Sequence, residues 1–272
     1  MTPLVPDSTG NSAGQHRQAA TLAALRQRIA GLERIGSSAG KSEAAQLPFG
    51  ISVLDAWLPG GGLLLGALHE VAGAGPDVEH GASAALFAAG VLARLSGPVL
   101  WVLEHSDLFA PGLAAVGLHP GRVLYVEAGR PAAVLAVMEE GLRERGLAGV
   151  VGEVAGRMTL TATRRLQLAA ESTGALAVAL RRSRRNDDPA LAEPSAAVTR
   201  WRVHVLPSGP ALPYAPGVPG LARARWRLEL LRCRGGEAGS WVVEACDAEG
   251  RLGVAADLAH GQAAPQPRRV RA

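Results

Sequence analysis

The sequence has almost no lysine: of its 28 basic residues, only Lys41 is a lysine and the other 27 are arginines. Cysteine and aromatic residues are also scarce, and two cysteines are too few for a disulfide scaffold and fit a reducing compartment. Proline and polar residues occupy the N-terminal positions where a secretory signal would need an apolar segment. The longest apolar runs, such as 84–93, are much shorter than the roughly 20 residues that cross a bilayer. We therefore expect a cytoplasmic protein with no membrane contact.

What the sequence does contain is apolar and unevenly charged. Its 272 residues are 48% hydrophobic, which is enough for one large α/β domain or two average domains. Residues 1–150 carry 10 basic and 13 acidic residues, whereas residues 151–272 carry 18 and 11. Any contact with a polyanion is therefore expected in the second half, unless this charge only solvates the surface.

Residues 1–46 are expected to precede the main domain. Residues 1–15 are rich in Pro, Ser, Thr and Gly, which predicts disorder, and residues 36–46 have the composition of a linker. Between them, residues 16–34 show the spacing of an amphipathic helix with one aliphatic stripe, formed by Leu22, Leu25, Ile29 and Leu32. This stripe either packs on its own domain or docks a partner protein.

Residues 47–254 predict an α/β domain. Short apolar strands are expected at 67–73, 98–104, 122–128, 147–154 and 175–181, and they alternate with helices at 82–95, 108–118, 131–146 and 158–173. This alternation is typical of a mainly parallel twisted sheet flanked by helices. Polar and apolar residues then alternate over 198–208, 224–236 and 240–254, which predicts antiparallel strands at the C-terminal edge. Residues 255–272 are expected to be a flexible tail.

The connection 72–83, between the first long strand and its helix, is where such a fold would hold a phosphate. A phosphate loop needs free backbone N–H groups, a lysine and a Ser or Thr. The connection carries a degenerate version of this pattern: Gly75, Gly81, Ala82 and Ser83. Its spacing is one residue too long, Ala82 replaces the lysine, and Asp77 and Glu79 would repel phosphate. We expect no nucleotide cofactor and no ATP hydrolysis.

Other catalytic patterns are absent from the sequence. The Gly-Lys-Ser triplet at 40–42 follows no predicted strand and is a chance match. The seven histidines lack the spacing of metal ligands. Glu104 beside His105 is a general-base candidate, but without a bound phosphate it has nothing to activate, so a structural pair is preferred. The sequence predicts a protein that is not an enzyme.

Two groups of arginines are the candidate contacts with DNA or a partner. The first follows the last predicted parallel strand and comprises Arg181, Arg182, Arg184 and Arg185. The second alternates at the start of a later strand, so that Arg223, Arg225 and Arg227 share one face. Arg232 and Arg234 join that face only if a β-bulge intervenes. Because only Trp201 is near enough to stack a base, single-stranded DNA binding is expected to be weak and salt-dependent at most.

Several segments together form a recognisable pattern. Leu54–Asp55 and Gly60–Gly62 stand ahead of the first core strand, and Glu104 is followed by His105. Gly152–Glu153 stand near the end of the strand predicted at 147–154, and the string Trp-Arg-Leu-Glu-Leu…Arg-Cys-Arg-Gly-Gly occupies 226–236. The first two features and the Glu-His pair resemble the RecA recombinase superfamily, although Gly152–Glu153 stand where an Asp would end its Walker B strand. With the string at 226–236, the most discriminating part, the chain resembles more specifically the ImuA family of RecA-like inducible mutagenesis accessory proteins, also labelled SulA-like.

The resemblance implies a RecA-like fold and a function without catalysis. Members of the family act in SOS-induced error-prone translesion DNA synthesis with an ImuB-like polymerase homologue and an error-prone C-family polymerase, and are thought to link them to RecA. The alternatives are a RecA-like ATPase or recombination regulator with an unorthodox loop, and a SulA-type cell-division inhibitor.

Overall fold

The computed structural model describes residues 45–255 apart from 213, 216, 219 and 220. The predicted helix at 16–34, with its stripe of Leu22, Leu25, Ile29 and Leu32, lies outside the described residues. So do residues 256–272 of the tail predicted over 255–272. Both therefore stay predictions.

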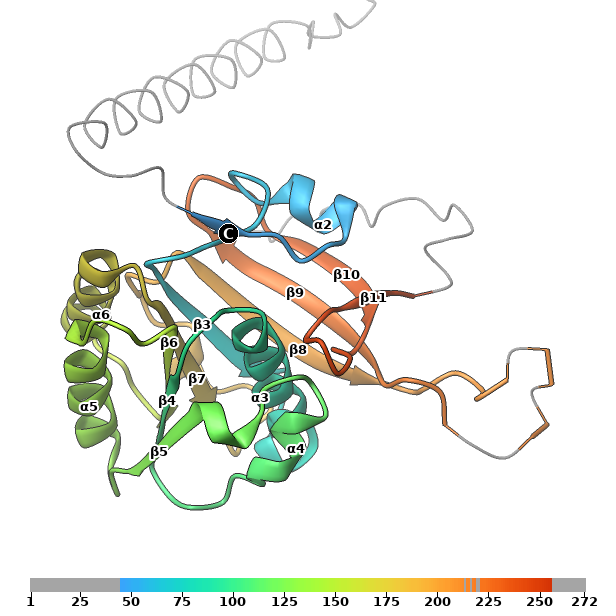
Figure 1. The fold of residues 1–272 in the computed structure, drawn as a ribbon, viewed down its shortest axis with the longest axis horizontal. Helices are drawn as coiled ribbons and strands as arrows, with labels where there is room; N and C mark the ends of the chain where they lie inside the picture. Colours follow the sequence, from blue (N-terminus) through green and yellow to red (C-terminus); the bar gives the residue numbers. More distant parts are fainter. Residues whose placement is uncertain (1–44, 213, 216, 219–220, 256–272) are drawn as a thin grey trace, which may run out of the picture. The chain divides into compact units, whose positions relative to one another are not determined.

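A nine-stranded sheet forms the centre of the described domain, in the order β11-β10-β9-β8-β3-β7-β6-β4-β5 (Figure 1). Its parallel part comprises β3 (Leu68–Gly73), β4 (Val99–Leu103), β5 (Val123–Glu127), β6 (Gly149–Ala155) and β7 (Leu176–Arg182). β8 (Thr199–Leu206) pairs in parallel with β3 and antiparallel with β9 (Arg225–Cys233). β10 (Gly239–Glu244) and β11 (Gly253–Val254) complete the antiparallel edge. The predicted fold class, a RecA-like α/β sheet with an antiparallel C-terminal edge, is confirmed.

Helices cover both faces of the sheet. α2 (Ser52–Trp57), α3 (Asp77–Ala93) and α4 (Ala110–Ala114) lie over one face, and α5 (Pro131–Arg143) and α6 (Leu160–Thr173) lie over the other. Three short elements connect them, namely the β1–β2 pair (Gln46–Leu47 with Leu63–Leu64), η1 (Pro120–Arg122) and η2 (Pro189–Leu191).

The two faces of β7 carry side chains of different size. Leu176, Val178 and Leu180 fill the core under α3, whereas the intervening residues on the α5–α6 side are Ala177 and Ala179. Successive strand residues point to opposite faces, so the large and small side chains are sorted by parity. All five are buried.

The predicted boundaries are wrong at two places. α3 begins at Asp77 rather than at residue 82, because Pro76 starts the helix and the acidic residues Asp77 and Glu79 fall in its first turn, where the positive end of the helix dipole favours them. The strand predicted over 240–254 is two strands, because a turn closed by the Gly250 N–H bonding to the Asp247 carbonyl separates β10 from β11.

Candidate functional site

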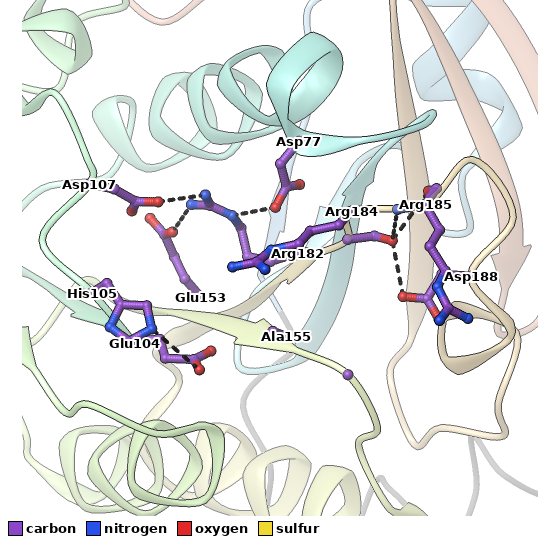
Figure 2. A pocket seen from close by; sticks show the side chains of 12 residues that line it. Asp77, Glu104, His105, Asp107, Glu153, Ala155, Arg182, Arg184, Arg185 and Asp188 are labelled. Atoms are coloured by element: carbon purple, nitrogen blue, oxygen red, sulfur yellow. Dashed lines mark hydrogen bonds and ion pairs between the residues drawn. The ribbon is translucent and has the colours of Figure 1, made fainter.

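A pocket of about 350 Å³ opens at the carboxyl ends of β4, β6 and β7, beside the first turn of α3 (Figure 2). Parallel α/β folds usually bind their ligands at this edge of the sheet. Five carboxylates and three arginines line it, namely Asp77, Glu104, Asp107, Glu153 and Asp188 with Arg182, Arg184 and Arg185. The lining is therefore net acidic at the position where a nucleotide phosphate would need positive charge.

Arg182 lies in the middle of this pocket and binds three carboxylates. Its Nε is 2.8 Å from Asp77 Oδ2, its Nη2 is 2.8 Å from Asp107 Oδ2, and its Nη1 donates to Glu153. Burial of the guanidinium would lower the pKa of Arg182, but the hydrogen bond to Asp77 and the three carboxylate charges outweigh it and raise this pKa. Arg182 is therefore a permanent cation, and all of its donor nitrogens bond to carboxylates.

Glu153 is the most buried of these carboxylates, with 3% of the residue exposed. Its Oε1 accepts a hydrogen bond of 2.8 Å from Trp101 Nε1, and its Oε2 accepts from Arg182. Burial raises the pKa of Glu153, and the bonds from Trp101 and Arg182 offset only part of this effect. The carboxylate at the end of β6 is thus held by side chains of the protein itself.

The backbone of the connection before α3 also has little capacity left for phosphate. The Ala74 N–H donates to the Val203 carbonyl at 3.0 Å, and the Asp77 N–H donates to the Ser183 carbonyl at 2.8 Å. Pro76 has no N–H at all. Of the four residues from Ala74 to Asp77, only Gly75 could therefore offer an N–H to a ligand, and a phosphate cradle needs several.

The residues predicted to form the degenerate loop lie mostly inside a helix. Gly75 is in the connection, but Gly81, Ala82 and Ser83 follow the first turn of α3. The Ser83 hydroxyl is buried and donates to the His80 carbonyl at 2.7 Å, and none of the three residues lines the pocket. The expectation of a loop over 72–83 is therefore wrong, since the connection comprises only residues 74–76.

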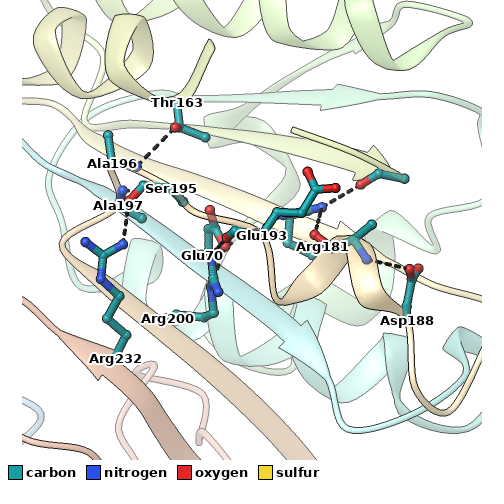
Figure 3. A network of polar contacts seen from close by, with 12 residues as sticks. Glu70, Thr163, Arg181, Asp188, Glu193, Ser195, Ala196, Ala197, Arg200 and Arg232 are labelled. Atoms are coloured by element: carbon teal, nitrogen blue, oxygen red, sulfur yellow. Dashed lines mark hydrogen bonds and ion pairs between the residues drawn. The ribbon is translucent and has the colours of Figure 1, made fainter. Parts of the chain in front are cut away.

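The first group of arginines does not form one surface. Arg181 is 3% exposed and donates to the Gly156 and Ala190 carbonyls, within 3.7 Å of Glu70 (Figure 3). Arg182 is engaged in the pocket. Only Arg184 and Arg185 are exposed, at the pocket rim. A contact between this loop and DNA would rest on those two residues alone.

The second group lies along β9 and just before it. Arg223 precedes the strand and is 3.7 Å from Glu244 and 3.8 Å from Asp247, whereas Arg225 and Arg227 lie on one face of β9. The register between β8 and β9 shifts at Arg200/Trp201.

The register shift between β8 and β9 is a β-bulge, and the sequence predicts that Arg232 shares a face with Arg227 only if such a bulge is present. Trp201 pairs with Leu230 and Arg200 pairs with Arg232, so that Leu231 is the extra residue. Because of this extra residue, Arg232 lies on the same face of β9 as Arg227.

The remaining candidates are weaker. His105 Nε2 is 3.8 Å from Glu104 Oε1, and the His105 side chain is mostly exposed, so this is a loose pair at the rim. Within the described residues no group of His, Cys, Asp or Glu is arranged to hold a metal ion. In the same part of the chain no helix is long and apolar enough to cross a membrane. The sequence drew attention to Asp77 and Glu153 but missed Arg182 as their common partner, because the three lie far apart along the chain.

Known proteins resemble this chain in sequence and in fold. No family model matches the chain. Protein ImuA from two strains of Caulobacter vibrioides is 43% identical over 210 residues, which covers 74% of this chain and 84% of each relative. Among solved structures, the RadB recombinase aligns with a TM-score of 0.52 and 17% identity over 77% of this chain and 99% of that chain, which shows the fold alone. The identity to the Caulobacter proteins, over most of both lengths, shows that the chain belongs to the ImuA family.

Proposed function

We propose that this protein is a non-catalytic accessory protein of SOS-induced error-prone translesion DNA synthesis. In this role it joins an ImuB-like polymerase homologue and an error-prone C-family polymerase to RecA. Membership of the ImuA family supports the accessory role. The observation that carries the absence of catalysis is Arg182, bound to three carboxylates in the pocket at the end of the parallel strands.

The charge arrangement explains why a nucleotide would bind poorly. A phosphate entering the pocket would have to compete with Asp77, Asp107 and Glu153 for the donors of Arg182. If it succeeded, it would leave those carboxylates unpaired next to its own negative charge. Both steps cost free energy, the second most strongly for Glu153 because it is buried.

Titration with a fluorescent ATP analogue and Mg²⁺, followed by phosphate-release assays with and without single-stranded DNA, tests this point. We expect no saturable binding and no turnover. Turnover that disappears in Glu104→Ala would show that the pocket is catalytic and would favour the ATPase alternative. Persistence of the signal in that variant would indicate a contaminating enzyme instead.

The linking role is tested by capture of purified partners. Immobilised full-length protein is mixed in turn with the ImuB-like protein, RecA and the C-family polymerase of the same organism. We expect RecA and at least one polymerase-type partner to be retained at physiological salt. Retention of none of them would refute the linking role. The double variant Leu25→Glu/Ile29→Glu tests whether the predicted helix at 16–34 makes the contact. If it does, the variant should capture the partner less well than the parent while its melting temperature stays unchanged.

Direct DNA binding is proposed to be weak and to involve the loop after β7. Because only Arg184 and Arg185 are exposed there, Arg184→Ala/Arg185→Ala should lower affinity for single-stranded DNA regardless of sequence and flatten its salt dependence. Equal binding by parent and variant would exclude the loop.

A further inference from the structure

The sheet extends past α5 and α6, and among the described residues no helix packs on one side of this extension. Trp201, Trp226 and Trp241 of β8, β9 and β10 all point to the α3 side, where they join the core. Their neighbours in each strand point the other way, and those on the outer face are half-buried or exposed. We call five residues of this outer side the arginine face, namely Arg202, Arg227, Leu231, Arg232 and Val242.

The carboxylates near the arginine face already have cationic or ionisable partners. Glu229 lies opposite Arg202 in the register but is 3.0 Å from His204 Nε2. Glu244 of β10 is 3.7 Å from Arg223. Neither glutamate is therefore within ion-pairing distance of an arginine of the face.

The three arginines of the face are consequently not neutralised. Arg202 and Arg227 make no ion pair with any carboxylate of the described residues. Arg232 donates to the Ser195 carbonyl, which is a neutral group. Arg202 of β8 and Arg227 of β9 are diagonal neighbours. Residues placed diagonally across an antiparallel pair are roughly 7–8 Å apart. Their mutual repulsion would be relieved by an anionic partner.

Apolar side chains accompany these charges. The bulge turns Leu231 outward, where it is 40% exposed and shares a small cavity with Arg200 and Arg202. Val242 lies beside Arg227 on β10 and is half-buried. Arginine together with exposed aliphatic residues is a composition typical of protein interfaces.

Nucleic acid fits this face less well than protein does. Single strands bind to surfaces that offer aromatic rings for base stacking, and the three tryptophans of these strands are all on the buried side. A continuous phosphate backbone would also pass over Glu229, which lies between the arginines. A protein segment can instead place carboxylates against the arginines and a neutral side chain against the glutamate.

We propose that the arginine face binds an acidic segment of a partner protein, whose carboxylates pair with Arg202 and Arg227 and whose aliphatic side chains pack on Leu231 and Val242. For the identity of the partner, this inference rests on the proposed function. The chemistry of the surface does not depend on it.

The test uses the full-length chain and a fluorescein-labelled peptide of glutamates and leucines, with binding followed by fluorescence anisotropy. Arg202→Gln/Arg227→Gln removes two charges and keeps side chains of moderate length. Arg145→Gln/Arg164→Gln removes two charges from exposed positions near α5 and on α6 and is the matched control. We expect the first variant to weaken binding about tenfold or more and the control to leave it unchanged. Glu229→Gln should strengthen binding, which a misfolded variant would not do.

Each result decides the inference. Equal losses in both double variants, or no binding by the parent, would overturn it. Binding of a labelled single-stranded oligonucleotide that depends on Arg202 and Arg227, with no peptide binding, would overturn it in favour of a nucleic-acid surface. Peptide binding on this face combined with failure to capture RecA or the ImuB-like protein would support the inference and refute the proposed function alone.

Discussion

Replacing Arg182 with methionine is expected to destabilise the protein more at neutral pH than at acid pH. The substitution leaves the buried carboxylate of Glu153 with a single hydrogen bond, from Trp101. Removing one partner of a buried ion pair typically costs about 3–5 kcal/mol. The Arg182 side chain is 28% exposed and Asp107 faces water, so part of this cost is screened. We expect a loss of about 2–3 kcal/mol in the free energy of unfolding at pH 7.5, or roughly 5–10 °C in melting temperature.

The pH dependence follows from the direction of the pKa shift. Burial raises the pKa of Glu153 in the folded protein, and losing Arg182 raises it further. A carboxyl whose folded pKa is raised binds protons more tightly in the folded state than in the unfolded state. At pH values above its folded pKa, the ionised carboxyl therefore lowers the free energy of unfolding by its full amount. This loss disappears as the pH falls to the unfolded pKa of about 4.3. The difference between variant and parent should shrink between pH 7.5 and pH 5.

Urea unfolding followed by circular dichroism at these two pH values measures the effect. Arg182→Met/Glu153→Gln is the rescuing control, because a neutral amide needs no counter-ion. Arg184→Met removes an exposed arginine from the same pocket and should change stability by less than about 0.5 kcal/mol. A loss in Arg182→Met that is absent, or that is equal at both pH values, would refute the reasoning.

Three further predictions concern the core. A Cβ added at Gly152 would lie 2.0 Å from Met138 Sδ, so Gly152→Ala should lower the free energy of unfolding in urea by about 1–3 kcal/mol. A Cβ added at Gly209 would have no atom within 4 Å, so the control Gly209→Ala should leave this free energy almost unchanged. Equal effects of the two substitutions would argue against overpacking. Burial lowers the pKa of His69 to about 4, so at pH values between 6.5 and 4 the unfolded state binds a proton that the folded state does not. The free energy of unfolding should therefore fall as the pH drops through this range. In His69→Gln this fall should be smaller by on the order of 2–3 kcal/mol, and a pH profile equal to that of the parent would contradict the prediction. Burial raises the pKa of the Cys246 thiol to about 12, so this residue should react with a disulfide reagent at pH 8 only after urea is added, and rapid labelling in the folded protein would contradict its burial.

Local patterns were sufficient to predict most of the fold. Short apolar runs identified β3 to β7, because both faces of a central parallel strand are buried, and alternation of polar and apolar residues identified β8 to β10, each to within a few residues. The start of α3 was misplaced because the acidic residues after Pro76 were interpreted as a defective phosphate loop. In the structure they are favourable first-turn residues of a helix, a role that depends on the backbone rather than on a motif.

The sequence by itself showed that the lysine of a phosphate loop is missing and that acidic residues lie near its expected place, since Ala82, Asp77 and Glu79 are visible without coordinates. Only the tertiary structure decided which side chains meet at the carboxyl ends of the parallel strands. Arg182 lies 105 residues from Asp77, 75 from Asp107 and 29 from Glu153, and the order β3-β7-β6-β4 brings the ends of these segments together. The tertiary structure also decided which arginines after β7 are buried, as Arg181 is, and which are exposed, as Arg184 and Arg185 are. Burial of a charge depends on neighbours that are distant in the chain.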